Sequence, residues 1–341
     1  MINVAVVGLG FMGVTHIKAY LQLKNARLAA ICDAARLPVN GDFSSISGNI
    51  PGWEPLKLDV SNMKVTRDLN ELLADPSIDV IDLCVPTPAH VKLATLALKA
   101  GKHVVCEKPL ARTSAQCREI LAAADQSSGY FMPAMCMRFW PGWSWLKSAI
   151  DEQTYGKVKA ARFRRVGEPP AWGREGYFNG AASGGALLDL HIHDTDFVQY
   201  LFGRPKAVYS QGFSFYSGAI DHVVTQYTVA CGASVSAEGS WMMSDGFGFH
   251  MAYTLVFERA TVDFDLSRGA DALKIFEQGK GARVITPEAG DGYSGELGYF
   301  IDCVANRRPP ARLTGRDGLS AVEICEAEEK SIQTGLPVAL A

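Results

Sequence analysis

The sequence predicts an α/β domain with a doubly wound parallel sheet, followed by an α+β domain with a large, mostly antiparallel open sheet. Short apolar runs alternate with helical patterns from residue 1 to about 135, which is typical of parallel strands covered by helices on both faces. Six later runs of strand type lie between 207 and 276. Because 341 residues exceed one ordinary domain, we expect two domains. The strand–helix alternation ends at about residue 135, which gives domains 1–135 and 136–341.

A glycine-rich turn follows the first apolar run. Ile2 to Val7 leads into Gly8-Leu9-Gly10-Phe11-Met12-Gly13, and a helical pattern comes next. A second apolar run ends in Asp33, 20 residues after Gly13. In this context the glycines predict a turn that brings the backbone close to a pyrophosphate, and Asp33 can accept hydrogen bonds from ribose hydroxyls. The carboxylate favours NAD, whereas Arg36 leaves NADP open.

Two further loops follow predicted strands and carry residues suited to a ligand. Val85 ends one strand and is followed by Pro86-Thr87-Pro88-Ala89-His90, where the prolines predict an extended loop. The other loop is Glu107-Lys108-Pro109. Strands of a doubly wound sheet end at one edge, where ligands bind, so we expect both loops to face the nicotinamide. The alternative for Glu107 and Lys108 is a surface ion pair.

The stretch Gly184 to Asp194 concentrates acids and imidazoles, and we expect it to begin a helix that runs to about Phe202. Asp189 and His193 are four residues apart and would share a helix face, with His191 pointing elsewhere. A carboxylate beside an imidazole suits proton transfer. Two alternatives stay open. One is a zinc site that draws on His191, His193, Asp194 and Asp196, although no third ligand with zinc-type spacing follows Asp189 and His193. The other is a purely structural His193 in a buried helix. We expect no metal.

The motifs together resemble the Gfo/Idh/MocA oxidoreductases, the glucose–fructose oxidoreductase and inositol dehydrogenase family. The matching features, in the family's order, are Gly8-Leu9-Gly10-Phe11-Met12-Gly13, Pro86-Thr87-Pro88-Ala89-His90, Glu107-Lys108-Pro109, Arg138-Phe139 and Gly184-Gly185-x-x-x-Asp189-x-x-x-His193. The chain departs from many members in having Cys136 and His191. The closing stretch, Glu296 to Val338, also looks like the family's last helices.

This resemblance implies an N-terminal Rossmann domain and a C-terminal domain that binds substrate and forms dimers or tetramers through its open sheet. Helices over about 293–335 are expected to pack back on the first domain. Lys108, His193 and Asp189 would be catalytic, with His193 as the general acid/base. The cofactor-binding set would be Gly8, Gly10, Phe11, Met12, Gly13, Asp33, Val85, Pro86, Thr87, Pro88, His90, Glu107, Lys108 and Arg138.

A loop from Glu168 to Asn179 is rich in proline, glycine and aromatic residues. Trp172 and Arg174 in it, and His191, are candidates for substrate contact, because an indole ring offers a flat face for sugar C–H groups. The alternative is that these aromatic residues are core or interface residues. The substrate class implied is a sugar, cyclitol or sugar derivative.

Composition excludes several other classes. The net charge is −3 with no basic cluster, so nothing favours nucleic acid or an anionic membrane. The eight scattered cysteines indicate reduced thiols in a cytoplasmic protein. We therefore predict an NAD(P)-dependent dehydrogenase or reductase acting on CH–OH groups. A non-catalytic dinucleotide-binding regulator and an NAD-dependent glycoside hydrolase are the alternatives.

Overall fold

The computed structural model describes residues 1–48, 53–170 and 174–340. The chain divides into two compact units, and the first is built from two separate segments. Unit 1 comprises Met1–Cys136 and Asp291–Leu319, and unit 2 comprises Met137–Gly290 and Ser320–Ala341. No helix among the described residues is long and apolar enough to cross a membrane.

Unit 1 contains a six-stranded sheet in the order β3-β2-β1-β4-β5-β6, and every neighbouring pair is parallel. This confirms the doubly wound parallel sheet. The four central strands are almost wholly buried towards their carboxyl ends, as expected for strands covered on both faces. The strands are β1 (Ile2–Val7), β2 (Ala26–Cys32), β3 (Lys64–Thr66), β4 (Val80–Leu83), β5 (His103–Glu107) and β6 (Phe131–Ala134).

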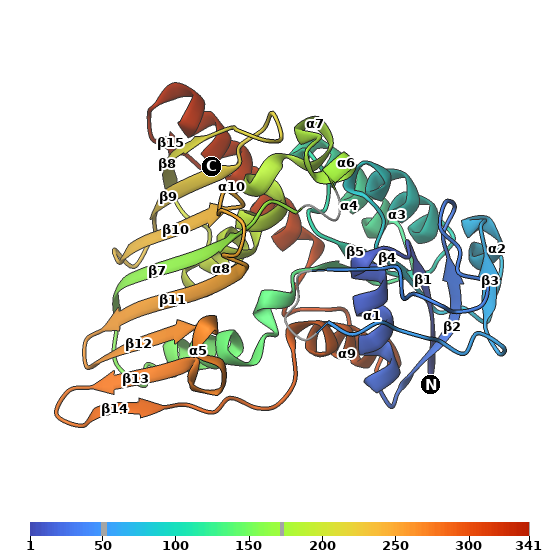
Figure 1. Ribbon diagram of the computed structural model, residues 1–341, viewed down its shortest axis with the longest axis horizontal. Helices are drawn as coiled ribbons and strands as arrows, with labels where there is room; N and C mark the ends of the chain where they lie inside the picture. Colours follow the sequence, from blue (N-terminus) through green and yellow to red (C-terminus); the bar gives the residue numbers. More distant parts are fainter. Residues whose placement is uncertain (49–52, 171–173, 341) are drawn as a thin grey trace. The chain divides into compact units, whose positions relative to one another are not determined.

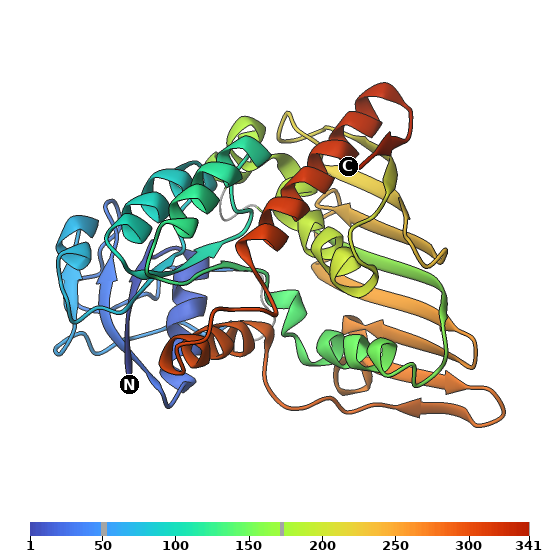
Figure 2. The same cartoon turned by 180° about the vertical axis from the view of Figure 1, so that it is seen from behind.

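Helices cover both faces of this sheet. Figures 1 and 2 show α1 and α9 side by side on one face and α3 and α4 side by side on the other. The helices are α1 (Phe11–Gln22), α2 (Leu69–Leu73), α3 (His90–Lys99), α4 (Ser114–Asp125) and α9 (Gly292–Ala305). Asp68 caps α2, and Thr113 and Gln116 form a capping box at α4.

The prediction of an extended loop at Pro86 and Pro88 is wrong. Residues Thr87–Ala89 form a 3₁₀ turn, η1, with the proline in its first turn. A proline's fixed φ suits the start of a helical turn as well as an extended chain, so the two prolines did not distinguish these conformations.

Unit 2 contains a nine-stranded sheet in the order β14-β13-β12-β11-β7-β10-β9-β8-β15. Only the β7–β10 pair is parallel, which confirms a mostly antiparallel sheet. The predicted strand runs are all present, and β14 and β15 were not predicted. The strands are β7 (Val158–Gly167), β8 (Ala207–Phe213), β9 (His222–Thr228), β10 (Ser234–Ser240), β11 (Phe249–Phe257), β12 (Ala260–Asp265), β13 (Leu273–Glu277), β14 (Gly281–Val284) and β15 (Val338–Ala339).

Helices lie along one face of this sheet (Figure 2). Buried and exposed residues alternate along its strands accordingly, for example in β9. The fully buried Trp143 of α5 contacts the rings of Phe197 and Tyr253 at centroid distances of 4.8 Å and 5.1 Å. The helical elements of the unit are η2 (Cys136–Arg138, which begins at the unit boundary), α5 (Pro141–Asp151), α6 (Arg174–Tyr177), α7 (Gly180–Ser183), η4 (Leu187–His191), α8 (Ile192–Phe202), η5 (Leu266–Asp271) and the later part of α10 (Gly315–Thr334).

Candidate active site

The glycine loop between β1 and α1 is tightly packed at Gly8 and Gly13 and open at Gly10. Gly8 has φ +91°, and a Cβ on it would lie 2.5 Å from the Cys84 carbonyl oxygen. A Cβ on Gly13 would lie 1.9 Å from the Gly8 carbonyl oxygen. A Cβ on Gly10, by contrast, would meet none of the described residues within 4 Å. The first and third glycines are therefore required by packing, and the middle one leaves the open space that a pyrophosphate needs.

Asp33 is joined to the glycine loop at the end of β2. Its Oδ2 accepts the Leu9 backbone N–H at 2.7 Å, and its Oδ1 accepts the N–H groups of Ala35 and Arg36 at 2.8 Å and 2.7 Å. Asp33 is half-buried, and a carboxylate has about four lone-pair sites. The group therefore retains capacity for ribose hydroxyls, and a dinucleotide fits these residues. No acidic residue lies in the first turn of α1, a stretch that the structure describes throughout.

The loop after β4 is exposed or half-buried except at its last residue. Pro86 and Pro88 are exposed, whereas His90 is buried. Its Nδ1 lies 2.9 Å from the Pro109 carbonyl oxygen and its Nε2 lies 2.8 Å from that of Val85. Burial lowers the pKa of His90. His90 therefore joins the two loops that follow β4 and β5, and a direct contact with cofactor stays a prediction.

Glu107 and Lys108 lie at the carboxyl end of β5. Glu107 is buried and Lys108 is half-buried. Oε2 of Glu107 accepts the Lys108 backbone N–H at 2.9 Å, and its Oε1 lies 3.1 Å from Nε2 of His16. Burial alone raises the pKa of Glu107, but the contact with His16 outweighs it and the pKa is lowered. Glu107 is therefore part of a buried network, and the surface position that the alternative requires does not apply to it.

Sequence reasoning missed two members of that network, His16 and Asp82. His16 is on α1 and its Nδ1 lies 2.8 Å from Oδ2 of Asp82 on β4, with both side chains fully buried. A signal was present, because Asp82 is the one charged residue in the apolar run Val80 to Val85. A carboxylate in a central strand needs a buried partner.

In unit 2, the acid–imidazole stretch begins with two glycines in the left-handed region. Gly184 and Gly185 have φ +79° and +70°, and a Cβ on Gly185 would lie 2.5 Å from the Ile220 carbonyl oxygen. The chain then forms the π-helical turn η4 before continuing as α8. The predicted helix is therefore confirmed from Leu187, with its first turn wider than an α-helix. Such turns are rare and are frequent at functional sites.

The accessible face of this stretch carries the predicted pair. Asp189, Leu190 and His193 are the residues between Gly184 and Gln199 that keep partial exposure, and the others, all described, are buried. In a π-helical turn residues four apart lie almost above one another, because the hydrogen bonds run from i to i+5. The carboxylate and the imidazole therefore share one accessible face.

Two arginines engage the neighbouring acids. Arg165 donates to both oxygens of Asp194 at 2.9 Å and 3.2 Å. Arg138 donates to Asp196 at 2.9 Å and 2.6 Å, and all four side chains are buried. These acids balance buried guanidinium groups, which is a role other than the zinc ligation considered above. The cofactor contact expected of Arg138 stays a prediction beside this ion pair.

His191 is fully buried, and its surroundings are those of a packing residue. Its Nε2 lies 3.1 Å from the Tyr227 hydroxyl and 3.5 Å from Oε1 of Glu328. A Cβ on Gly239 of β10 would approach within 2.5 Å of the His191 Cβ. We therefore do not include His191 among the groups proposed to meet substrate. Trp172 and the side chain of Arg174 lie outside the described residues.

These observations define a class: an oxidoreductase with a dinucleotide-binding unit and a second unit that presents an acid–imidazole face. Comparison with known proteins identifies the family. Residues 2–135 match the model of the Gfo/Idh/MocA oxidoreductase family with an NAD-binding Rossmann fold, and residues 143–263 match the Gfo/Idh/MocA C-terminal domain. The chain belongs to this family, and NAD is its cofactor.

Several relatives are similar over nearly their whole length. The myo-inositol 2-dehydrogenase of Thermotoga maritima is 26% identical over 97% of this chain and 96% of its own. The scyllo-inositol 2-dehydrogenase (NAD(+)) of Bacillus subtilis is 25% identical over 99% of this chain and 96% of its own. A solved levoglucosan dehydrogenase, in complex with NADH and L-sorbose, has a TM-score of 0.83 at 22% identity and covers 100% of this chain and 99% of its own. That likeness concerns the fold.

Proposed function

We propose that the protein is an NAD-dependent dehydrogenase or reductase acting on a hydroxyl-bearing carbon of a sugar, cyclitol or sugar derivative. The observation that carries the proposal is the accessible face of η4 and α8, where Asp189 and His193 keep exposure among buried neighbours. Relatives named for inositol and levoglucosan support the substrate class. NADP remains open as a second cofactor because Arg36 is exposed beside Asp33.

In this proposal three side chains handle the hydroxyl proton. The nicotinamide supplies the hydride acceptor or donor. His193 would take the proton from the substrate hydroxyl during oxidation, because an imidazole titrates near neutral pH. Asp189 would orient His193 and favour its protonated form. The Lys108 ammonium would stabilise the developing alkoxide charge.

The test is a screen for NADH formation against sugars, cyclitols, sugar acids and glycosides, with NAD⁺ and NADP⁺ in separate assays. We expect sustained reduction of NAD⁺ with one class of free polyol. Binding of NADH without turnover of any compound would indicate a regulator. Release of free sugar from glycosides without net NADH would indicate a hydrolase, and either result would contradict the proposal.

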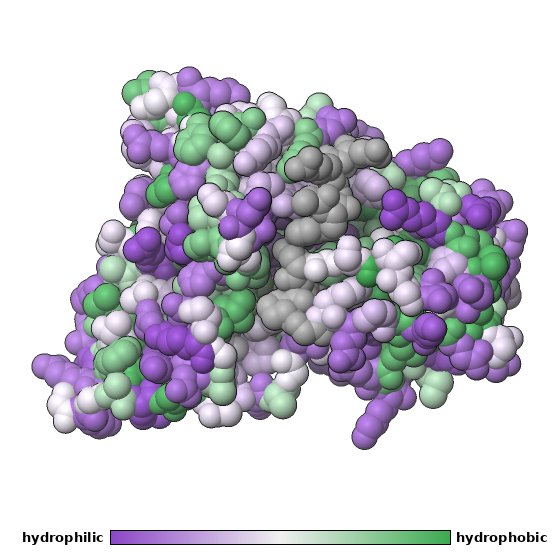
Figure 3. Space-filling view, in the orientation of Figure 1, coloured by the Kyte–Doolittle hydropathy of each residue, from purple (hydrophilic) through white to green (hydrophobic). Residues whose placement is uncertain are grey.

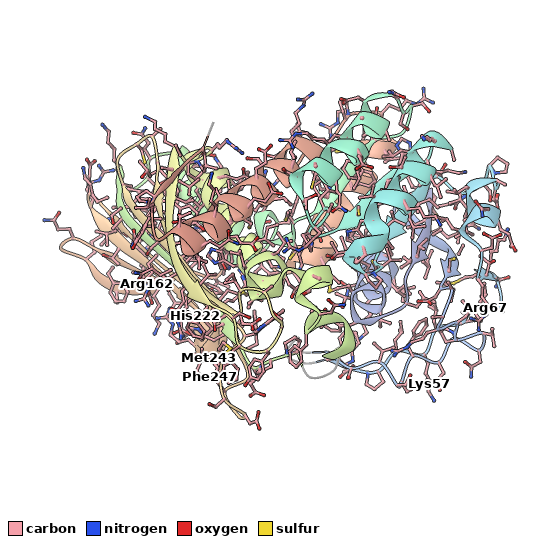
Figure 4. All side chains as sticks on the ribbon, turned by 90° about the horizontal axis from the view of Figure 1, so that it is seen from above. Lys57, Arg67, Arg162, His222, Met243 and Phe247 are labelled. Carbon is pink, nitrogen blue, oxygen red and sulfur yellow. The ribbon has the colours of Figure 1, made fainter. Side chains whose placement is uncertain are left out.

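We further infer a cytoplasmic homodimer or homotetramer that associates through the exposed face of the nine-stranded sheet. Figure 4 shows Arg162 of β7 and His222 of β9 on this outward side, and Figure 3 shows polar and apolar residues interspersed over the part it displays. The apolar Val224 and Val256 are 38% and 41% exposed there. Light scattering should give a dimer or tetramer mass, and Val224→Glu should lower it; a monomeric wild-type protein would contradict this.

A further inference from the structure

A buried cluster of ionisable side chains lies in unit 1, beneath the glycine loop. His16 of α1 lies between two carboxylates on neighbouring strands: Nδ1 is 2.8 Å from Asp82 Oδ2, and Nε2 is 3.1 Å from Glu107 Oε1. The side chains of His16 and Asp82 are fully buried and that of Glu107 is 8% exposed. The cluster therefore links the phosphate-binding helix to the strands that precede both predicted cofactor loops.

A carboxylate on each side of the ring favours the charged imidazole. Nδ1 is hydrogen-bonded to Asp82, and Nε2 lies within ion-pair distance of Glu107 without forming a hydrogen bond. Two neighbouring negative charges stabilise the doubly protonated cation over the neutral ring, which carries one N–H. Burial acts to lower the pKa of His16, but the charge of Asp82 and the hydrogen bonds outweigh it and the pKa is raised well above 6.5. Other ionisable groups facing this cluster, among the described residues, are Tyr20, Cys84, Cys106, Lys108, Tyr293 and Glu296.

Glu107 connects His16 to Lys108, which is one of the residues proposed to act on substrate. Its Oε1 faces His16, and its other oxygen accepts the backbone N–H of Lys108 at 2.9 Å. We propose that His16 is a positioning residue, a buried imidazolium that orients Glu107 and thereby holds the backbone of Lys108 at the end of β5. The effect on turnover rests on the function proposed above, whereas the charge of His16 and its hold on Lys108 do not.

A metal ion is the competing explanation, since His16, Asp82 and Cys84 each offer one ligand atom within 4.8 Å of the others. The distances favour hydrogen bonds. Nδ1 and Oδ2 are in direct contact at 2.8 Å, and the Cys84 sulfur lies 3.6 Å from Asp82 Oδ1 in a donating geometry. Burial raises the pKa of the Cys84 thiol, whereas zinc is bound by thiolate.

Two substitutions separate the two contacts of His16. Asparagine places its amide nitrogen near the position of Nδ1, and glutamine places its amide nitrogen near that of Nε2. His16→Asn therefore keeps a donor for Asp82 and loses the one for Glu107, whereas His16→Gln does the reverse. Both remove a buried cation, so both should lower the thermal midpoint to a similar extent, which makes them controls for each other.

The first measurements need only the protein. Histidine ¹⁵N spectra of the full chain should show both His16 nitrogens protonated from pH 7 to 9, with the resonances assigned by their loss in the variants. Exchange of the Lys108 amide hydrogen should accelerate in His16→Asn more than in His16→Gln. A neutral His16 at pH 7, equal acceleration in both variants, or stoichiometric zinc that is lost in both would overturn the proposal.

The last measurement uses a substrate found by the NADH screen. We expect kcat to fall about 10-fold or more further in His16→Asn than in His16→Gln, with a smaller change in KM, because a displaced lysine weakens transition-state contacts most. Equal kcat losses that follow the thermal midpoints would show a merely structural role. If the screen finds no substrate, the spectra and amide exchange still decide whether His16 positions Lys108.

Discussion

At the scale of single residues, the candidate catalytic groups are distinguished by partial exposure next to buried charge. Lys108 follows the buried Glu107, and His193 precedes the buried Asp194. We expect Lys108→Ala and His193→Ala to lower kcat at least 100-fold, because each removes a group that we propose contacts the reacting hydroxyl. NADH affinity, measured by fluorescence titration, should change only a few-fold.

Lys92→Ala is the control for the loss of a lysine, because Lys92 is exposed on α3 of the same unit. Its turnover should match that of the wild type. Near-wild-type rates in both Lys108→Ala and His193→Ala would remove these residues from the reaction.

We expect Asp33 to set the preference between NAD and NADP. Its carboxylate caps three backbone N–H groups and is expected to bind the ribose hydroxyls. Asp33→Ala should weaken NAD binding by about 1.5–3 kcal/mol, the range for a hydrogen bond to a charged group, and NADP binding far less. Titrations of Asp33→Asn, which keeps an acceptor oxygen and loses the charge, show how much of the discrimination is electrostatic. Unchanged NAD affinity in Asp33→Ala would exclude the ribose contact.

At the scale of elements, different glycines of the β1–α1 turn are expected to serve packing and ligand binding. Gly13→Ala should destabilise the fold, because its Cβ would lie 1.9 Å from the Gly8 carbonyl oxygen. Gly10→Ala should leave the thermal midpoint nearly unchanged, because Gly10 has φ −79° and its Cβ meets no described residue within 4 Å. The added methyl group would instead occupy the phosphate space and weaken NADH binding.

Thermal melts with and without NADH distinguish the two glycine variants. Gly10→Ala should melt like the wild type without ligand and lose most of the NADH-induced shift. A full NADH shift in Gly10→Ala would show that the pyrophosphate does not approach this residue.

Elements with a strong local signal could be predicted from the sequence. A short stretch of sequence is enough to recognise the apolar runs of β1, β4 and β11 and the capped start of α2. β14 is exposed at every position and β15 has two residues, so neither carries an apolar pattern. The π-helical turn at Leu187 depends on packing against the chain at Ile220, which no local pattern records.

In the candidate site, too, the residues with a local sequence signal could be predicted and those that depend on distant contacts could not. The glycine loop, Asp33 and Lys108 follow predicted parallel strands. The order of these strands in the sequence is enough to place the three at the carboxyl edge of the sheet. The ion pairs of Asp194 and Asp196 and the contact between His16 and Glu107 join residues far apart in the chain. Such pairs follow from strand order and helix placement, so they became visible only in the folded chain.

At the scale of the whole molecule, unit 1 is completed by a segment from the far end of the sequence. α9 packs beside α1, and it places Glu296 in the buried interior near His16. Glu296 is fully buried, and neither of its carboxyl oxygens has a hydrogen-bond partner among the described residues. Burial is the main cause that raises the pKa of Glu296 well above 4.5, His16 lowers it in part, and the carboxylates of Glu107 and Asp82 raise it further.

This buried acid makes global stability depend on pH. Below the unfolded-state pKa of about 4.3, both states hold the proton and Glu296 contributes no pH dependence. Above it, the unfolded chain releases the proton while the folded chain keeps it, so the free energy of unfolding falls by about 1.4 kcal/mol per pH unit until the folded pKa is reached. Glu296→Gln cannot ionise and should avoid this loss.

We therefore expect Glu296→Gln to match the wild type in thermal midpoint near pH 4.5 and to exceed it increasingly towards pH 8. Glu119→Gln, at an exposed position on α4 of the same unit, is the control and should show no such divergence. The melting transition that NADH shifts reports on unit 1 and is the one to follow. A midpoint difference that stays constant from pH 4.5 to 8 would mean that Glu296 is ionised in the folded protein, and that the interior beneath the cofactor site holds one more negative charge than the structure indicates.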